Sequence, residues 1–232
     1  MAVEIAQKYG EGVFAAVGSH PMYAAAEFIK IKADPSEGDA VVESGFDKEQ
    51  YRELAQSKRV VAIGEIGLDY YYKPKSTTKL SQFKEKQKQI FLDQLNLAKK
   101  LQLPVILHCR MAHKDLIEIL ESRIKNYELR GVVHCFTGSL EEMKQYIDLG
   151  FYIGINGIIF KLNLDGIIKE SPLENMLVET DCPYLTPPQE GNIRNEPVFI
   201  KHTIEKIADL KRISFEKVCQ KTTENAKRLF QI

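Results

Sequence analysis

The chain has 232 residues, of which 44% are hydrophobic and 28% charged, the composition of an ordinary globular protein with one sizeable core. Its 32 basic residues balance 32 acidic ones, which argues against a protein that holds nucleic acid on a broad basic surface. The same balance is compatible with an enzyme that neutralises one or two phosphates locally with bound metal.

The beginning of the chain, residues 1–9, lacks the basic segment and apolar run of a signal peptide. No apolar stretch approaches the length that spans a bilayer. The four cysteines show no CxxC spacing, so reduced thiols are expected. We therefore expect a cytoplasmic protein without membrane association, and we infer no obligate protein partner.

Short apolar and β-branched runs alternate with longer stretches of helical period along the chain. This alternation is typical of βα units and a parallel sheet, so we predict a single α/β domain over residues 1–232. Six strands are predicted, at residues 13–18, 60–64, 105–108, 131–134, 151–154 and 176–181. Helices are predicted at residues 2–9, at 47–57 with Asp47 as the cap, and at 83–101 with Phe91, Leu95 and Ala98 along one apolar face. Two more are predicted, one that begins at a Ser139–Glu142 capping box and one at residues 214–232.

Four of the predicted strands end in a residue that can bind a metal: Glu65, His108, His134 and Asp181. Since sites in parallel α/β folds lie at the carboxyl ends of the strands, these side chains are expected to converge. Two imidazoles and two carboxylates suit a divalent transition metal. A single strand-terminal His or Asp more often makes a local hydrogen bond, but four in register favour a metal site.

Three of these residues are followed directly by a cysteine: Cys109, Cys135 and Cys182. Neighbouring side chains of a strand point to opposite faces. If the ligands face the site, the cysteines are therefore expected to face the helix layer as buried spacers rather than as thiolate ligands.

Six motifs follow one another in the chain: Val-Gly-Ser-His-Pro from Val17, Gly-Glu-Ile-Gly-Leu-Asp-Tyr from Gly64, Leu-His-Cys-Arg from Leu107, His-Cys-Phe-Thr-Gly from His134, Glu-Thr-Asp-Cys-Pro-Tyr-Leu from Glu179 and Arg-Asn-Glu-Pro from Arg194. In this order the sequence resembles the TatD family of metal-dependent deoxyribonucleases, from its first residues to its last helix. The resemblance implies a TIM-type (β/α)8 barrel that hydrolyses phosphodiester bonds of DNA, as an exonuclease, with two divalent ions such as Mg, Mn or Zn.

By the family pattern, Glu65 bridges the two ions, His108 and His134 hold one of them, and Asp181 holds the other while it orients the attacking water. Glu65 and Asp181 are thus the expected catalytic residues. Two neighbouring ions lower the pKa of a bound water and stabilise the attacking and leaving oxygens. A carboxylate beside that water can take its proton.

Further residues are candidates for contact with the substrate. His20 and Arg110 are expected to bind substrate phosphate, with a structural salt bridge or loop hydrogen bond as the alternative for each. Arg194 is also expected to bind substrate, as part of a late loop with Asn195 and Glu196 that matches the family and shapes the mouth of the site. Asp69 and the tyrosine run 70–72 are candidates to line the mouth of the site, with a half-buried packing role as the commoner alternative for the tyrosines. His113 and His202 are expected to have packing or surface roles, because neither ends a strand.

The sequence departs from the family in one respect, because no two of its five histidines form the His-x-His pair of the family's first strand. Six strands instead of eight agree with a member that lacks its first two strands. One metal site is then complete in residue type, while the other keeps only Glu65 and Asp181. The alternatives are a non-catalytic remnant with a binding or regulatory role, or a hydrolase of another ester or amide.

Overall fold

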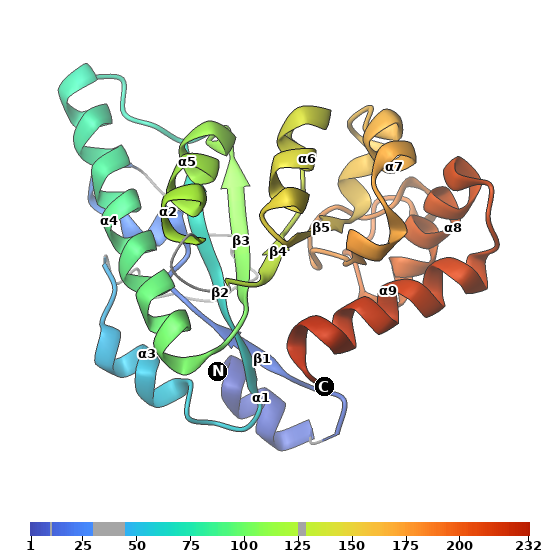
Figure 1. Cartoon of the computed structure of the whole chain (residues 1–232), viewed down its shortest axis with the longest axis horizontal. Coiled ribbons are helices and arrows are strands. Elements are labelled where there is room, and N and C mark those ends of the chain that lie inside the picture. The colour runs from blue at the N-terminus through green and yellow to red at the C-terminus, as the bar shows by residue number, and fades with distance from the viewer. Residues whose placement is uncertain (10, 30–44, 125–128) are drawn as a thin grey trace. The chain divides into compact units, whose positions relative to one another are not determined.

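The computed structural model describes residues 1–9, 11–29, 45–124 and 129–232. These residues form two compact units, Met1–Ala112 and His113–Ile232, each with three parallel strands and flanking helices (Figure 1). The α/β class and all six predicted strand positions are confirmed within these ranges. The single-domain organisation stays a prediction.

The first unit contains the strands β1 (Ala15–Val17), β2 (Val60–Asp69) and β3 (Val105–Arg110), which pair in parallel in this order. Its longest helix lies along β2 (Figure 1) and buries the predicted face of Phe91, Leu95 and Ala98, each at most 1% exposed. The Asp47 side chain caps a short helix, as predicted, by accepting from the backbone of Glu49. The helices of this unit are α1 (Ala2–Tyr9), α2 (Pro21–Ala24), the 3-10 turn η1 (Ala26–Phe28), α3 (Lys48–Leu54) and α4 (Thr77–Leu101).

The strand β2 continues beyond Gly64, where the sequence predicted its end. Ile63 pairs with Val105 and Ile66 with Leu107, so two residues of β2, Gly64 and Glu65, lie opposite one residue of β3 in a bulge. Gly67 has φ +143°, and a Cβ atom there would lie 2.0 Å from the carbonyl oxygen of His108. The glycines of this motif thus allow close approach of two strands, and Glu65 lies inside the strand rather than at its end.

The second unit contains β4 (Gly131–Val133), β5 (Phe151–Ile155) and β6 (Met176–Val178), again parallel and in this order. The Ser139–Glu142 capping box is present. Asn225 of the last helix donates to the backbone oxygen of Met176 at 2.9 Å and so fixes that helix on β6. The α-helices of this unit are α5 (His113–Ile124), α6 (Leu140–Asp148), α7 (Asp165–Glu170), α8 (Ile200–Lys211) and α9 (Phe215–Phe230), and its 3-10 turns are η3 (Gly157–Phe160), η4 (Leu173–Asn175), η5 (Pro188–Glu190) and η6 (Pro197–Phe199).

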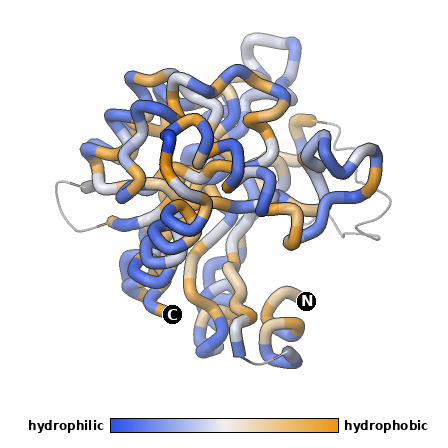
Figure 2. Tube along the Cα trace, turned by 90° about the vertical axis from the view of Figure 1, so that its right-hand side faces the viewer, coloured by the Kyte–Doolittle hydropathy of each residue, from blue (hydrophilic) through white to orange (hydrophobic). Residues whose placement is uncertain are grey.

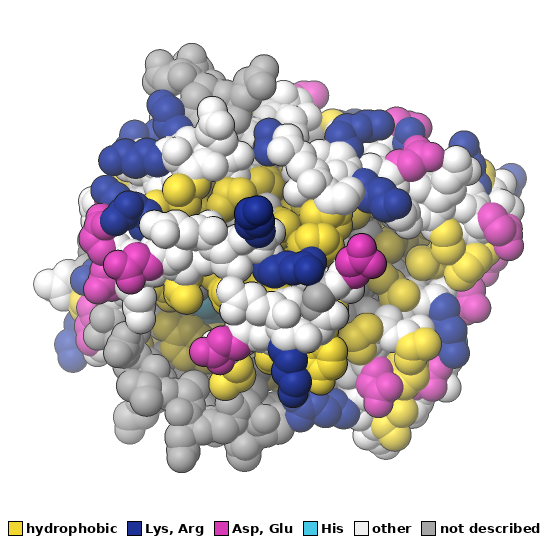
Figure 3. All heavy atoms as spheres, turned by 90° about the horizontal axis from the view of Figure 1, so that it is seen from below, with side chains coloured by type: hydrophobic (Ala, Val, Ile, Leu, Met, Phe, Trp, Pro, Cys, Tyr) yellow, Lys and Arg dark blue, Asp and Glu magenta, His cyan; other side chains and the backbone are white. Residues whose placement is uncertain are grey.

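Hydrophilic and hydrophobic residues are mixed along the helices, as in the one that leads to the C-terminus in Figure 2. Basic and acidic side chains are interspersed on the face that Figure 3 shows, in agreement with the balanced net charge. Among the described residues, no helix is both long and apolar enough to cross a membrane.

Candidate active site

In the first unit, His20, Glu65 and His108 bring their ligand atoms within 4.8 Å of one another. His108 Nδ1 lies 2.7 Å from Glu65 Oε1 and 3.2 Å from His20 Nε2. The three side chains are 18–32% exposed, so solvent and a ligand can reach them. Imidazole nitrogen and carboxylate oxygen are ligands of Zn and Mn, and this donor set therefore fits a divalent ion.

His20 differs from the other two because it also caps α2. Its Nδ1 accepts a hydrogen bond from the backbone N–H of Met22 at 3.2 Å. In the neutral ring Nε2 then carries the proton, so it faces Glu65 and His108 as a donor. This geometry favours a hydrogen bond from Nε2 to an acceptor oxygen over a bond to metal, and the role of His20 in substrate binding stays a prediction.

His108 is held from behind by Asp69, whose carboxylate oxygen lies 3.0 Å from Nε2. Burial by itself raises the pKa of Asp69, but the hydrogen bond and charge of His108 outweigh it, and the pKa of this carboxyl is lowered. Burial likewise opposes the charge on His108, yet the bonds to Asp69 and Glu65 raise its pKa. An ionised Asp69 accepts from Nε2 and leaves Nδ1 directed at Glu65, the arrangement of a metal-ligating histidine backed by a carboxylate.

Asp69 itself is fixed by the surrounding backbone and by α4. Its side chain is 1% exposed and accepts from the N–H of Tyr71 at 2.8 Å. Gln87 of α4 accepts from the backbone N–H of Asp69 at 2.9 Å and donates to its carbonyl at 3.0 Å. The carboxylate that orients His108 therefore has little freedom to move.

In the second unit, His134 lies between two carboxylates. Its Nδ1 is 2.8 Å from Glu179 Oε2, and its Nε2 is 3.4 Å from Asp181 Oδ1. Glu179 also accepts from the backbone N–H of Cys135 at 2.6 Å and from Asn156 Nδ2 at 3.1 Å. These bonds fix Glu179 as the partner of Nδ1, which directs Nε2 of His134 toward Asp181.

Cys135 does not face away from these residues, contrary to the expectation from strand alternation. The strand β4 ends at Val133, and Cys135 has φ 46°, so the alternation of side chains no longer applies. Its ligand atom lies within 4.8 Å of those of His134 and Asp181, and its thiol is 3.6 Å from Asn156 Oδ1. Burial raises the pKa of the Cys135 thiol to about 11, which keeps it protonated at neutral pH. Cys109 in β3 is buried as expected, whereas Cys182 is exposed.

The segment with Asp181 is a turn rather than a strand. The strand β6 ends at Val178, and Asp181 has φ 57°, which corrects the predicted strand 176–181. Asn195 is 5% exposed and donates to the carbonyl of Thr180 at 2.8 Å and to that of Tyr184 at 2.5 Å. The late polar loop is thereby tied to the turn with Asp181, and its neighbour Arg194 is exposed.

The predicted ligands fall two in each unit, Glu65 and His108 in the first and His134 and Asp181 in the second. Their meeting in one metal centre stays a prediction. The sequence interpretation missed the carboxylate Glu179 and the buried amide Asn156. An acidic residue inside the apolar run 176–181 and a polar residue directly after β5 were the signals that could have found them.

His113 and His202 have the structural environments expected from the sequence. His113 is 8% exposed and packs against Phe136 and Tyr146. His202 lies 2.6 Å from Glu190.

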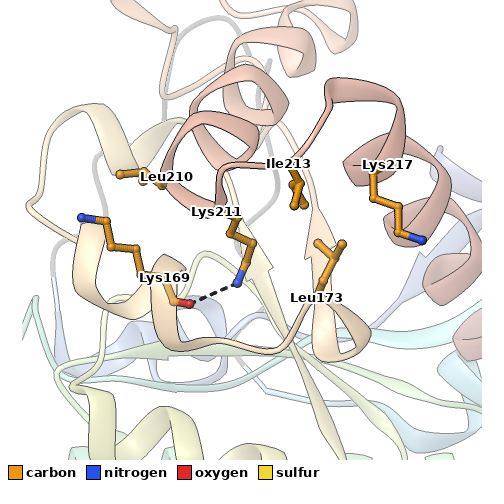
Figure 4. A pocket seen from close by; sticks show the side chains of 6 residues that line it. All are labelled: Lys169, Leu173, Leu210, Lys211, Ile213 and Lys217. Atoms are coloured by element: carbon orange, nitrogen blue, oxygen red, sulfur yellow. Dashed lines mark hydrogen bonds between the residues drawn. The ribbon is translucent and has the colours of Figure 1, made fainter.

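A shallow pocket of about 360 Å³ lies in the second unit (Figure 4). Lys211 Nζ donates to the carbonyl of Lys169 at 3.3 Å there, and burial lowers the pKa of this amine. Leu173 of the lining precedes β6, whereas Asp181 follows it. The pocket is therefore at the other end of this strand and is distinct from the His134 cluster. It is lined by Lys169, Leu173, Leu210, Lys211, Ile213 and Lys217.

Comparison with known proteins shows the family to which the chain belongs. The model of the family described as "TatD related DNase" matches residues 1–231. The chain belongs to the TatD family. It is 38% identical over 234 residues to the uncharacterized metal-dependent hydrolase YabD of Bacillus subtilis, with 100% of this chain and 82% of that protein covered. It is 37% identical over 193 residues to the 3'-5' ssDNA/RNA exonuclease TatD of Yersinia pseudotuberculosis, with 80% and 71% covered.

Solved TatD structures share the fold. The crystal structure of the TatD homologue YJJV from Escherichia coli matches with a TM-score of 0.78 and 28% identity over 99% of this chain and 81% of that one. A TatD family hydrolase from Entamoeba histolytica matches with a TM-score of 0.76 and 26% identity, over 99% of this chain and 79% of that one. The TIM-type fold class predicted from the sequence is thereby confirmed, and the chain is a member of a metal-dependent hydrolase family.

Proposed function

We propose that this TatD protein is a metal-dependent deoxyribonuclease that removes nucleotides from the end of a DNA strand. The observation that carries the proposal is a repeated arrangement. His108 has one ring nitrogen directed at the buried Asp69 and the other at the more exposed Glu65. His134 has one ring nitrogen directed at the hydrogen-bonded Glu179 and the other at the more exposed Asp181. Such an arrangement orients imidazoles for a metal ion.

The residues that would hold the metal are Glu65, His108, His134 and Asp181, with Mg, Mn or Zn as candidate ions and two ions as the proposed number. A bound divalent ion supplies an activated water at neutral pH and neutralises charge on the phosphate. Asp181, whose side chain is 30% exposed, is the proposed acceptor of the proton of that water. The His20 Nε2–H group is the proposed donor to a phosphate oxygen, and Arg110 and Arg194 the cations that hold the strand.

The names of relatives support nucleic acid as the substrate. The Yersinia protein is named as an exonuclease of single-stranded DNA and RNA, as is the TatD protein of Pectobacterium atrosepticum at 34% identity over 100% of this chain. By extension we propose cleavage from the 3' end. The Bacillus relative, named only as a metal-dependent hydrolase, keeps other esters and amides as the competing substrate class.

A substrate panel with and without metal tests the proposal. Labelled single-stranded DNA, single-stranded RNA and duplex DNA are incubated with the protein and Mg or Mn, next to a chromogenic phosphodiester and an amide. We expect stepwise shortening of single-stranded DNA from its 3' end, loss of this activity with EDTA, and recovery with added Mn. Hydrolysis of the amide alone, or cleavage that EDTA leaves intact, would contradict the proposal.

A further inference from the structure

Two aromatic side chains and one cation form an exposed cluster in the first unit. Tyr71 and Tyr72 are 48% and 50% exposed, and their rings lie 4.8 Å apart with planes at 90°. The guanidinium carbon of Arg110 lies 3.6 Å from the centre of the Tyr71 ring and 5.8 Å from that of Tyr72. We call Tyr71, Tyr72 and Arg110 the aromatic platform.

Core packing does not explain the platform. The residue before it, Tyr70, is 5% exposed, contacts the ring of Phe83 and lies under the amine of Lys84. The next two tyrosines leave half of their surface in water. Neighbouring large apolar side chains that stay exposed commonly mark a binding surface, and aromatic rings beside cations are the elements that bind unpaired bases.

The platform is attached directly to the His108 cluster. Asp69 accepts from the N–H of Tyr71 at 2.8 Å and lies 3.0 Å from His108 Nε2. Arg110 is opposite Asp69 in the register of β2 and β3, and its carbonyl accepts from the N–H of Tyr70 at 2.9 Å. Ordered strands therefore hold the platform next to the candidate metal ligands.

The local charge fits a nucleic acid strand. Arg110 is exposed, and Lys73 and Lys75 follow the tyrosines as exposed residues in the connection from β2 to α4 (Figure 1). A guanidinium can stack on a ring and still donate to a phosphate. The platform thus offers ring faces for a base and cations for the backbone that links it to the next nucleotide.

We infer that the aromatic platform stacks an unpaired base of the substrate strand beside the candidate metal ligands, and that Tyr71 and Tyr72 supply this contact. The inference rests on the proposed nuclease function, to which it adds the residues that hold a base of the substrate. In a duplex both faces of an internal base are already stacked, so the platform can engage only a base that has left the helix. Stacking on one aromatic ring is sequence-tolerant, because every base has a π face.

Binding without hydrolysis isolates the platform from the chemistry. Affinity is measured in EDTA by fluorescence anisotropy for a short labelled single strand and for the same strand with abasic sites at its 3' end. We expect the natural strand to bind more tightly by roughly 5- to 150-fold, the range that stacking of one base supports. Tyr71→Ala combined with Tyr72→Ala should remove this preference, while the two Phe replacements should keep it.

Tyr9→Ala is the matched control, because Tyr9 is 66% exposed with the Lys8 amine 5.6 Å from its ring but lies in α1. It should leave the preference for bases unchanged. Equal affinity of the wild-type protein for natural and abasic strands would overturn the inference, as would an unchanged preference in the folded double Ala variant. Loss of the preference in the Phe variant would also overturn it, since the hydroxyl groups rather than the rings would then be responsible.

The proposed function and this inference can be refuted independently of each other. Absence of cleavage with Mn, together with a base preference that the tyrosines carry, would refute the nuclease and leave the platform as a binding surface. Cleavage of the natural strand by a protein without any base preference would refute the platform alone.

Discussion

The imidazole of His108 lies between Asp69 and Glu65, with Nε2 3.0 Å from the first carboxylate and Nδ1 2.7 Å from the second. The two acids differ in exposure, since the Asp69 side chain is 1% exposed and that of Glu65 32%. The buried Asp69 therefore fixes the orientation of the ring. The accessible Glu65 lies beside the opposite nitrogen, Nδ1, where solvent or a metal ion can reach both groups. His134 likewise lies between two carboxylates, Glu179 and Asp181, whose side chains are 22% and 30% exposed.

Asp69→Asn should weaken metal binding about 10- to 100-fold, the usual effect of losing the carboxylate behind a metal-ligating histidine. The amide has the same shape but can no longer hold the Nε2 proton by charge. Isothermal titration with Mn or Zn measures the change. Asp148→Asn is the control, because Asp148 is exposed at the end of α6 and should bind metal as the wild type does. Equal metal affinity of both variants would show that Asp69 does not support metal binding by His108.

Glu179→Gln should have a comparable effect through His134. Glu179 Oε1 accepts from Cys135 N and Asn156 Nδ2, so a Gln side chain can keep these two bonds while it loses the charge beside Nδ1. Nitrogen NMR of His134 should then show a mixture of ring tautomers in place of one with the proton on Nδ1. A variant with an unchanged His134 spectrum and full metal affinity would show that Glu179 does not orient this ring.

His20→Asn separates substrate binding from metal binding. Asn is a good N-cap residue, so it can keep the bond to the N–H of Met22, but its side chain is too short to replace Nε2. We expect KM for an oligonucleotide to rise by about 10-fold, which corresponds to one lost hydrogen bond to a charged oxygen. The metal affinity should stay within about 2-fold of the wild-type value, which we count as unchanged. A large loss of metal affinity would instead identify His20 as a ligand.

Cys135→Ser should leave metal binding and activity nearly unchanged, although the thiol lies close to His134 and Asp181. Burial raises the pKa of this thiol to about 11, so the neutral form is stable and the thiolate that would bind metal is disfavoured. His134→Ala in the same titration should abolish binding at this cluster. A Cys135→Ser variant that loses metal affinity more than about 10-fold would mark the thiol as a ligand.

The order of strands and helices could be predicted because it depends on local patterns. Asp47, the Ser139–Glu142 capping box and the apolar face of α4 all lie where the sequence predicts them. The ends of β2 and β6 could not be predicted, because they depend on contacts with other segments of the chain. The bulge at Glu65 lies beside Gly67, whose backbone packs closely against the carbonyl of His108 on the neighbouring strand. The turn with Asp181 is held by a hydrogen bond from Asn195 to the carbonyl of Thr180.

The candidate site shows the same division. Glu65 and His108 come at the ends of recognisable apolar runs in the sequence, and the structure brings their side chains together within strands β2 and β3. The partners Asp69 and Glu179 are identified only by the three-dimensional structure, since nothing in a linear sequence says which nitrogen of a histidine a carboxylate meets. Cys135 was misplaced for a related reason: two residues beyond the end of β4 the backbone turns, and a rule for extended strands no longer holds.

The central claim is that Glu65 belongs to a metal centre that cleaves DNA, and one comparison tests it most directly. A 3'-labelled single strand is incubated with Mn and with wild-type protein, Glu65→Gln, or Glu53→Gln, a control at an exposed position of α3. We predict cleavage by the wild type and the control, and a loss of at least about 100-fold in Glu65→Gln, since a metal ligand supports several kcal/mol of transition-state stabilisation. Equal cleavage by all three proteins, or no cleavage by folded wild-type protein saturated with Mn, would contradict the account.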